Sequence, residues 1–153
     1  MPGTHSKWVL VEDGIIKQFS TYMTGELFAQ LSQHSILRHS VTGAGSFGPD
    51  HPQFVAAAQQ MSEQPAGLSG ALFSVRANSL VHGADATASA ARLSGLLIGA
   101  EIGAARLATG DAPVVLVGAG PLGKLYEAAL ALAGMRFSVT DGEALSRAGL
   151  HAA

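Results

Sequence analysis

The sequence has 153 residues, enough for a single domain or for half of a larger two-lobed protein. Its formal charge is -2, from 9 basic and 11 acidic residues, and without a basic run this balance argues against a nucleic-acid ligand. The absence of cysteine excludes disulfides and thiolate metal sites.

The N-terminal segment predicts a β-hairpin followed by a helix. Two β-rich runs within SKWVLVEDGIIKQFSTYMT flank Asp13 and Gly14, a dipeptide that tolerates the positive φ angles of a two-residue turn. Thr24 precedes GELFAQLSQHSIL and is placed to cap the first amides of a helix. The expected apolar face of that helix comprises Leu27, Leu31 and Ile36.

The middle of the chain predicts a loop and two more helices. Residues 42–52 have a loop composition, and a helix restarts after Pro52. GLSGALFSVRANSLVHG is interpreted as a helix despite its glycines, although LFSVRA alone also fits a strand. The inward side chains expected from this segment are Leu72, Val75 and Leu80.

The longest predicted helix runs from Asp85 to Leu107. Gly95, Gly99 and Gly103 recur every four residues, so bare backbone follows one face at a cost of about 1 kcal/mol per glycine relative to alanine. Close packing of another helix or of a sheet would offset that cost. The apolar stripe expected here comprises Leu93, Leu96, Leu97, Ala100, Ala104 and Leu107.

The C-terminal third predicts a strand-helix-strand unit. VVLVG is typical of a buried strand, a helix follows from Pro121 to Gly134, and RFSVT returns as a second strand. The last dozen residues, GEALSRAGLHAA, are long enough for a short helix and a tail. The order of elements predicts an α/β fold with a mixed sheet.

The first turn of this unit matches a dinucleotide fingerprint. Gly118, Gly120 and Gly123 follow the strand in the GxGxxG spacing, and Asp141 lies 18 positions beyond the last of them. Only 12 residues follow Asp141, whereas a dinucleotide domain continues with further strands. The motif alone leaves open a dinucleotide site, another ligand, or glycines that merely fit a tight turn.

A second candidate site is the loop before the hairpin, in MPGTHSKW. Gly3 lets backbone amides approach a ligand, Thr4, His5 and Ser6 offer donors, and Lys7 supplies a positive charge. Such a loop suits a phosphate chain, although the residues alone favour reading Lys7 and His5 as ordinary surface residues. The six histidines form no HExxH-like pair, so no metal-binding residue is assigned.

Composition also bears on localisation and partners. The sequence contains neither a signal peptide nor a run of about 18 apolar residues, and we expect a soluble cytoplasmic protein that contacts no membrane. Charged residues make up only 13% of the chain, which indicates that part of the surface is meant for a partner.

Four segments resemble a known family and occur in its order: MPGTHSKWV, TGELFAQLSQHSIL, LFSVRA and LSGLLIGAEIGAARL. They make essentially the whole chain similar to the carboxyl-terminal half of the 2-dehydro-3-deoxygalactonokinases, also called 2-keto-3-deoxygalactonate kinases. The family belongs to the sugar kinase, hexokinase and actin-like superfamily, in which two ribonuclease H-like lobes enclose ATP and substrate. The resemblance implies that residues 1–153 form the C-terminal nucleotide-binding lobe, an α/β lobe with a mixed sheet and flanking helices.

The same resemblance implies a reaction, the ATP-dependent phosphorylation of 2-dehydro-3-deoxy-D-galactonate at its 6-hydroxyl in galactonate catabolism, with ATP and Mg as cofactors. It assigns the β- and γ-phosphates of ATP to one set of residues: Gly3, Thr4, His5 and Lys7. It assigns adenosine to the VGAG turn, at Gly118, Ala119 and Gly120, which leaves Asp141 to cap the last helix.

Three further charged residues are secondary candidates. Glu26 lies in the first turn of its helix, where the helix dipole favours a carboxylate whether or not a nucleotide is near. Arg76 and Glu101 are interpreted as structural rather than catalytic. Glu101 is nevertheless the one charge amid GLLIGAEIGA, and a charge in an apolar helix needs a partner or a solvent-lined cleft.

The chain also departs from the family, because the first phosphate loop, most sugar contacts and the acidic catalytic group belong to the N-terminal lobe, which does not precede Met1 here. Phosphoryl transfer depends on positioning and charge on both sides of the γ-phosphate. We therefore assign no catalytic residue, and expect little kinase activity from this chain alone and sugar-acid binding only with the other lobe.

An exposed apolar face would favour a homodimer. The alternative is a non-catalytic dinucleotide-binding or assembly module that uses the GAGPLG turn.

Overall fold

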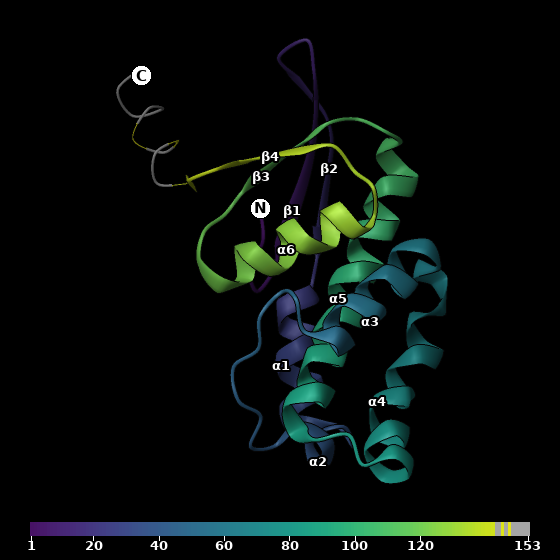
Figure 1. The fold of residues 1–153 in the computed structure, drawn as a ribbon. Helices are drawn as coiled ribbons and strands as arrows, with labels where there is room; N and C mark the ends of the chain where they lie inside the picture. Colours follow the sequence, from purple (N-terminus) through teal and green to yellow (C-terminus); the bar gives the residue numbers. More distant parts are fainter. Residues whose placement is uncertain (143–144, 146, 148–153) are drawn as a thin grey trace.

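The computed structural model describes residues 1–142, 145 and 147 and has two parts joined by one long helix, α5 (Ala86–Thr109). The strands and α6 (Gly120–Leu132) lie at one end of α5 (Figure 1). At the other end lie α1 (Thr24–His34), α2 (Arg38–Val41) and α4 (Leu68–His82), while α3 (Pro52–Glu63) runs beside α5. The C-terminal helix and tail predicted for residues 142–153 lie largely outside the described residues.

The N-terminal hairpin was predicted correctly. Strands β1 (Ser6–Glu12) and β2 (Ile15–Tyr22) pair antiparallel, with Ser6 opposite Tyr22. Asp13 and Gly14 adopt φ angles of 51° and 74°, as a tight two-residue turn requires.

The strand-helix-strand unit at the C-terminal end is confirmed. Strands β3 (Val114–Val117) and β4 (Phe137–Thr140) pair in parallel, and α6 connects them. The glycine-rich turn therefore lies at the carboxyl end of β3 and opens directly into α6. This is the position at which parallel α/β units present ligand sites.

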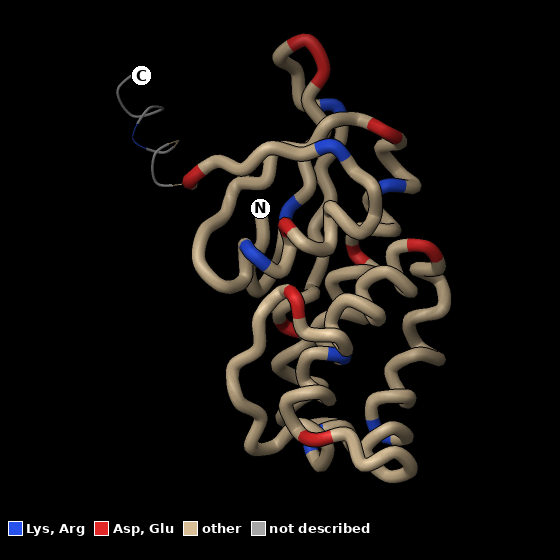
Figure 2. The backbone as a smooth tube through the Cα atoms, viewed as in Figure 1, with Lys and Arg blue, Asp and Glu red and all other residues tan. Residues whose placement is uncertain are grey.

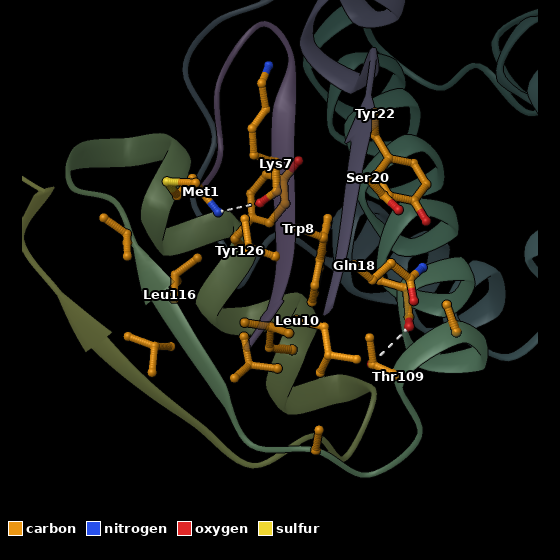
Figure 3. A pocket seen from close by; sticks show the side chains of 18 of the residues that line it. Met1, Lys7, Trp8, Leu10, Gln18, Ser20, Tyr22, Thr109, Leu116 and Tyr126 are labelled. Atoms are coloured by element: carbon orange, nitrogen blue, oxygen red, sulfur yellow. Dashed lines mark hydrogen bonds between the residues drawn. The ribbon is translucent and has the colours of Figure 1, made fainter. Parts of the chain in front are cut away.

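The expected mixed sheet is wrong for this structure: the strands form two separate pairs, β1-β2 and β3-β4. No backbone hydrogen bond between described residues joins β1 to β3. At the β1 edge, the Lys7 amide and carbonyl are already bonded to the Met1 carbonyl and amino group, each at 3.0 Å. A cavity of about 240 Å³ separates the two edges and is lined by consecutive residues of both strands, including Trp8, Leu10 and Leu116 (Figure 3).

The remaining helices confirm the predicted helical middle. They are α1 (Thr24–His34), α2 (Arg38–Val41), α3 (Pro52–Glu63), the 3-10 turn η1 (Pro65–Gly67) and α4 (Leu68–His82). LFSVRA is therefore helical, not a strand. The Asp85 carboxylate accepts the Ala88 amide at 2.7 Å and so begins α5 where the sequence indicated.

The glycine stripe of α5 has the packing role that the sequence predicted. A Cβ at Gly95 would lie 2.5 Å from the Phe54 carbonyl oxygen, and one at Gly103 would lie 2.7 Å from that of Ser62. Between them, Gly99 faces the backbone of Ala58. Helices α3 and α5 thus touch backbone to backbone, which requires glycine at all three positions.

Two buried clusters lie on either side of this contact. One joins α5 to α1, α2 and α4 and includes Leu37, Met61, Val75, Leu93 and Leu96. The other joins α5 to α6 and β3 and includes Phe54, Ile98, Ile102, Leu116 and Leu130. The core therefore fixes α6, and with it the glycine-rich turn, to the same helix that carries Glu101.

Several side-chain predictions were wrong. Leu80 and Leu107 are 66% and 80% exposed, and each lies near the C-terminal end of its helix. Ile36 is exposed since α1 ends at His34. Thr24 makes no cap, because α1 begins at Thr24 itself and Met23 occupies the N-cap position; the Thr24 hydroxyl donates to Glu101. No helix in the described part of the chain is long and apolar enough to cross a membrane.

Candidate functional site

The N-terminal loop, residues 1–5, lies against the first turn of α1. The Glu26 amide donates to the Thr4 carbonyl at 3.0 Å, and the His5 ring and Glu26 carboxylate are hydrogen-bonded at 2.5 Å. A Cβ at Gly25 would lie 2.7 Å from the Gly3 carbonyl oxygen, so glycine is required for the loop to sit this close. The structure therefore brings Gly3, Thr4, His5 and Glu26 together.

Lys7 belongs to the same group. Its ammonium donates to the His5 carbonyl at 2.8 Å, and the side chain points away from the cavity between the strands (Figure 3). Because an ammonium has three N–H donors, two remain for another acceptor. This is a cation held beside the loop and able to meet an anion there.

The glycine turn, Gly118–Gly120, has two features of an anion or nucleoside site. Gly120 has a φ of 69°, a left-handed conformation that favours glycine. Ala119 precedes α6 and provides no side-chain cap, so the first amides of the helix have no side-chain acceptor. Positive dipole and unsatisfied donors at such a helix start attract negative groups.

The loop and the turn are neighbours although more than 100 residues separate them in the chain. A Cβ at Gly118 would lie 3.3 Å from Cδ of Pro2, and the N-terminus lies beside α6 and β3 (Figure 1). The two glycine-containing segments that the sequence singled out therefore form one surface. Exposed backbone, one ammonium and two hydroxyl or imidazole groups meet there.

Arg76 does not join this surface. It lies on α4, and its guanidinium donates to the Ser40 hydroxyl on α2 at 3.4 Å. Lys and Arg are sparse along the backbone, with no basic cluster in the residues described (Figure 2). The structural role that the sequence analysis favoured for Arg76 stays a prediction.

Glu101 lies beneath the loop and the turn and is only 3% exposed. Its Oε1 accepts the Trp8 indole N–H at 2.7 Å, and its Oε2 accepts the Thr24 and Tyr126 hydroxyls at 2.5 and 2.6 Å. Sequence reasoning recognised that Glu101 needs a partner but named none of these three. The available signal was that a buried carboxylate needs donors, for which a lone tryptophan and a tyrosine in an apolar helix are candidates.

Ionisation of Tyr126 should make the stability of the fold depend on pH. Burial, together with the charge and hydrogen bond of Glu101, raises the pKa of Tyr126 well above its usual 10. Because the unfolded chain loses this proton first, the free energy of unfolding should fall as the pH rises past about 10.

Tyr126→Phe is therefore expected to make the alkaline decline shallower, as urea unfolding between about pH 9.5 and 11.5 would measure. Tyr22, whose pKa burial also raises, should retain part of the slope. At neutral pH the variant should lose about 1 kcal/mol for its missing hydrogen bond. An unchanged slope would mean that Tyr126 ionises freely in the folded chain.

Comparisons with known proteins agree on one family. The family model described as 2-keto-3-deoxy-galactonokinase matches residues 1–153. A probable 2-dehydro-3-deoxygalactonokinase of Rhizobium meliloti strain 1021 is 46% identical over 154 residues, which cover 100% of this chain and 50% of that protein. The 2-dehydro-3-deoxygalactonokinase of Escherichia coli K12 is 34% identical over 153 residues, covering 98% and 50%.

A solved structure gives the same result. A crystal structure assigned to a 2-dehydro-3-deoxygalactonokinase protein of Sinorhizobium meliloti matches with a TM-score of 0.93 and 46% identity, over 99% of this chain and 50% of that one. The chain thus spans about half the length of the curated relatives it matches. With a family model matched from its first residue to its last, the chain belongs to the 2-keto-3-deoxy-galactonokinase family.

Proposed function

We propose that the chain is the C-terminal nucleotide-binding lobe, ribonuclease H-like, of a kinase that transfers the γ-phosphate of ATP to the 6-hydroxyl of 2-dehydro-3-deoxy-D-galactonate. The family membership and the half-length match to both curated relatives support this proposal. The observation that carries it in this structure is the contact of Pro2 with Gly118, which makes the N-terminal loop and the glycine turn one surface.

Each side of this surface suits one part of the nucleotide. Gly3, Thr4 and His5 present backbone and side-chain donors to the β- and γ-phosphates, and Lys7 adds a positive charge. The bare backbone of the glycine turn accommodates adenosine, which a Cβ would hold at a distance. In this proposal the glycines between β3 and α6 contact the nucleoside, and Asp141 does not bind a ribose.

Magnesium has no proposed ligand here. No group of three His, Asp or Glu side chains among the described residues is arranged to hold a metal ion. The phosphates of ATP and the partner lobe would carry the ion, and the same lobe would supply the sugar contacts and the acidic group. With one side of the γ-phosphate unsupported, the 153 residues alone should transfer phosphate poorly.

Stabilisation by nucleotide tests the proposal. Magnesium-ADP at about 100 times its dissociation constant should raise the free energy of unfolding by roughly 2.7 kcal/mol, measured by urea unfolding with and without ligand. NAD should have no comparable effect. Gly120→Val should abolish the ADP effect, since valine cannot adopt the φ of 69° without moving the turn.

Gly83→Val is the matched control. Gly83 has a φ of 66° at the end of α4, so the substitution imposes a similar backbone strain, about 1–2 kcal/mol, away from the site. This variant should be less stable but should still respond to magnesium-ADP. Stabilisation by NAD alone would replace the kinase proposal with the dinucleotide module, and no stabilisation of the wild-type chain by either ligand would refute a nucleotide site in this lobe.

A further inference from the structure

Glu101 receives three hydrogen bonds from three separate parts of the fold. Trp8 lies on β1, Thr24 begins α1, and Tyr126 lies on α6, while Glu101 itself lies in the middle of α5. Both carboxylate oxygens are used, and the side chain is almost completely buried. One charged group on α5 therefore makes hydrogen bonds to β1, α1 and α6.

Each donor lies close in sequence to a segment of the proposed nucleotide site. Trp8 follows Lys7 directly, and Thr24 precedes Gly25, against which the backbone of Gly3 and Thr4 packs. Tyr126 lies one helical turn after Gly123, whose Cβ position is 3.5 Å from the Gly118 carbonyl carbon. The three hydrogen bonds thus reach both flanks of the N-terminal loop and the base of the glycine turn.

Stability alone does not explain a carboxylate at this position. A buried ion costs several kcal/mol in lost hydration, and a well-packed apolar side chain is often at least as stable. What a carboxylate adds is direction, because each of its oxygens accepts only along restricted geometries and so fixes its donors relative to one another. Position 101 lies where β1, α1 and α6 meet α5, so a carboxylate there fixes these elements relative to one another.

We propose that Glu101 is a positioning residue that fixes the N-terminal loop relative to the glycine turn, so that both engage one nucleotide together. This inference rests on the proposed function of those two segments. Without the carboxylate each segment retains its own shape, but the contact of Pro2 with Gly118 is left to hold the two together. A ligand that touches both is then weakened more than one that touches only one.

The test compares magnesium-ADP, which spans both segments, with adenosine, which reaches only the glycine turn. Dissociation constants would be measured by titration calorimetry for the wild-type chain, Glu101→Gln and Thr24→Val. Both variants should raise the dissociation constant of magnesium-ADP by about 10-fold or more and that of adenosine by less than about twofold. A 10-fold effect is the size expected for coupling between two sites. If Glu101→Gln does not fold, Thr24→Val carries the test, because it removes one hydroxyl and leaves the charge in place.

Two controls separate positioning from general destabilisation. Thr24→Ser keeps the hydroxyl and should keep the wild-type affinity for magnesium-ADP. Val75→Ala opens a cavity in the cluster between α4 and α5, away from Glu101, and should lower stability without changing the ratio of the two affinities. The chain has a single tryptophan, so the one indole N–H signal in a ¹⁵N spectrum should shift in Glu101→Gln but not in Val75→Ala.

The outcomes distinguish the two proposals. If the wild-type chain binds magnesium-ADP and Glu101→Gln binds it equally well, or loses adenosine to the same extent, Glu101 is structural only and the positioning role is refuted while the nucleotide site stands. If the wild-type chain binds neither ligand, the proposed function fails and the positioning role fails with it.

Discussion

Gly99→Ala is expected to lower the free energy of unfolding by about 2–3 kcal/mol, the range of an overpacked core, although alanine is the better helix former. The added Cβ would meet the backbone of Ala58, whose Cα lies 2.8 Å from that position. Backbone cannot rotate aside as a long side chain can, so α3 would have to move away from α5. Because α3 and α5 share both buried clusters, that movement would loosen the whole core.

Gly70→Ala is the matched control for this prediction. Gly70 is also inside a helix, α4, but nothing lies within 4 Å of its Cβ position. The substitution should therefore stabilise the chain by up to about 1 kcal/mol, from helix propensity alone. Urea unfolding of the two variants measures the difference, and equal effects would contradict the backbone contact between α3 and α5.

The glycine stripe also shows how much of the helix packing could be predicted from the sequence. Three glycines at a spacing of four have no local purpose in a helix, so their cost predicted a close neighbour, and α3 is that neighbour. The Asp13-Gly14 turn and the β3-α6-β4 unit were equally predictable, because turn chemistry and hydrophobic pattern act locally. The family resemblance, now confirmed, came from longer segments than any of these rules use.

The predictions that failed depend on contacts distant in sequence. Thr24 has the local chemistry of a helix cap, but it is the first residue of α1, and its hydroxyl donates to a buried carboxylate 77 positions away. The mixed sheet required the N-terminal hairpin to pair with the β3-β4 unit, and no local pattern indicates that Met1 occupies the Lys7 edge of β1. The partners of Glu101 were missed for the same reason, since Trp8 and Tyr126 are 93 and 25 positions from it.

Gly25→Ala is expected to weaken the binding of magnesium-ADP by about 10- to 100-fold, which is equivalent to losing one or two charge-assisted hydrogen bonds. The new Cβ would lie 2.7 Å from the Gly3 carbonyl oxygen and 2.8 Å from Cα of Thr4, so the N-terminal loop must move off the first turn of α1. That shift would carry Thr4 and His5 away from the phosphates. The helix itself should tolerate alanine at this position.

Three comparisons make this prediction specific. Adenosine affinity should change little, because the new Cβ at Gly25 would meet Gly3 and Thr4 of the loop and not the glycine turn. Gly70→Ala, also a helical glycine, should leave both affinities unchanged. Calorimetric titration of each variant provides the measurement, and an unaltered affinity of Gly25→Ala for magnesium-ADP would show that the N-terminal loop does not bind the phosphates. Since the packing of Gly25 against Gly3 and Thr4 depends on backbone alone, such a result would leave the loop with a structural role only, as a brace between β1 and α1.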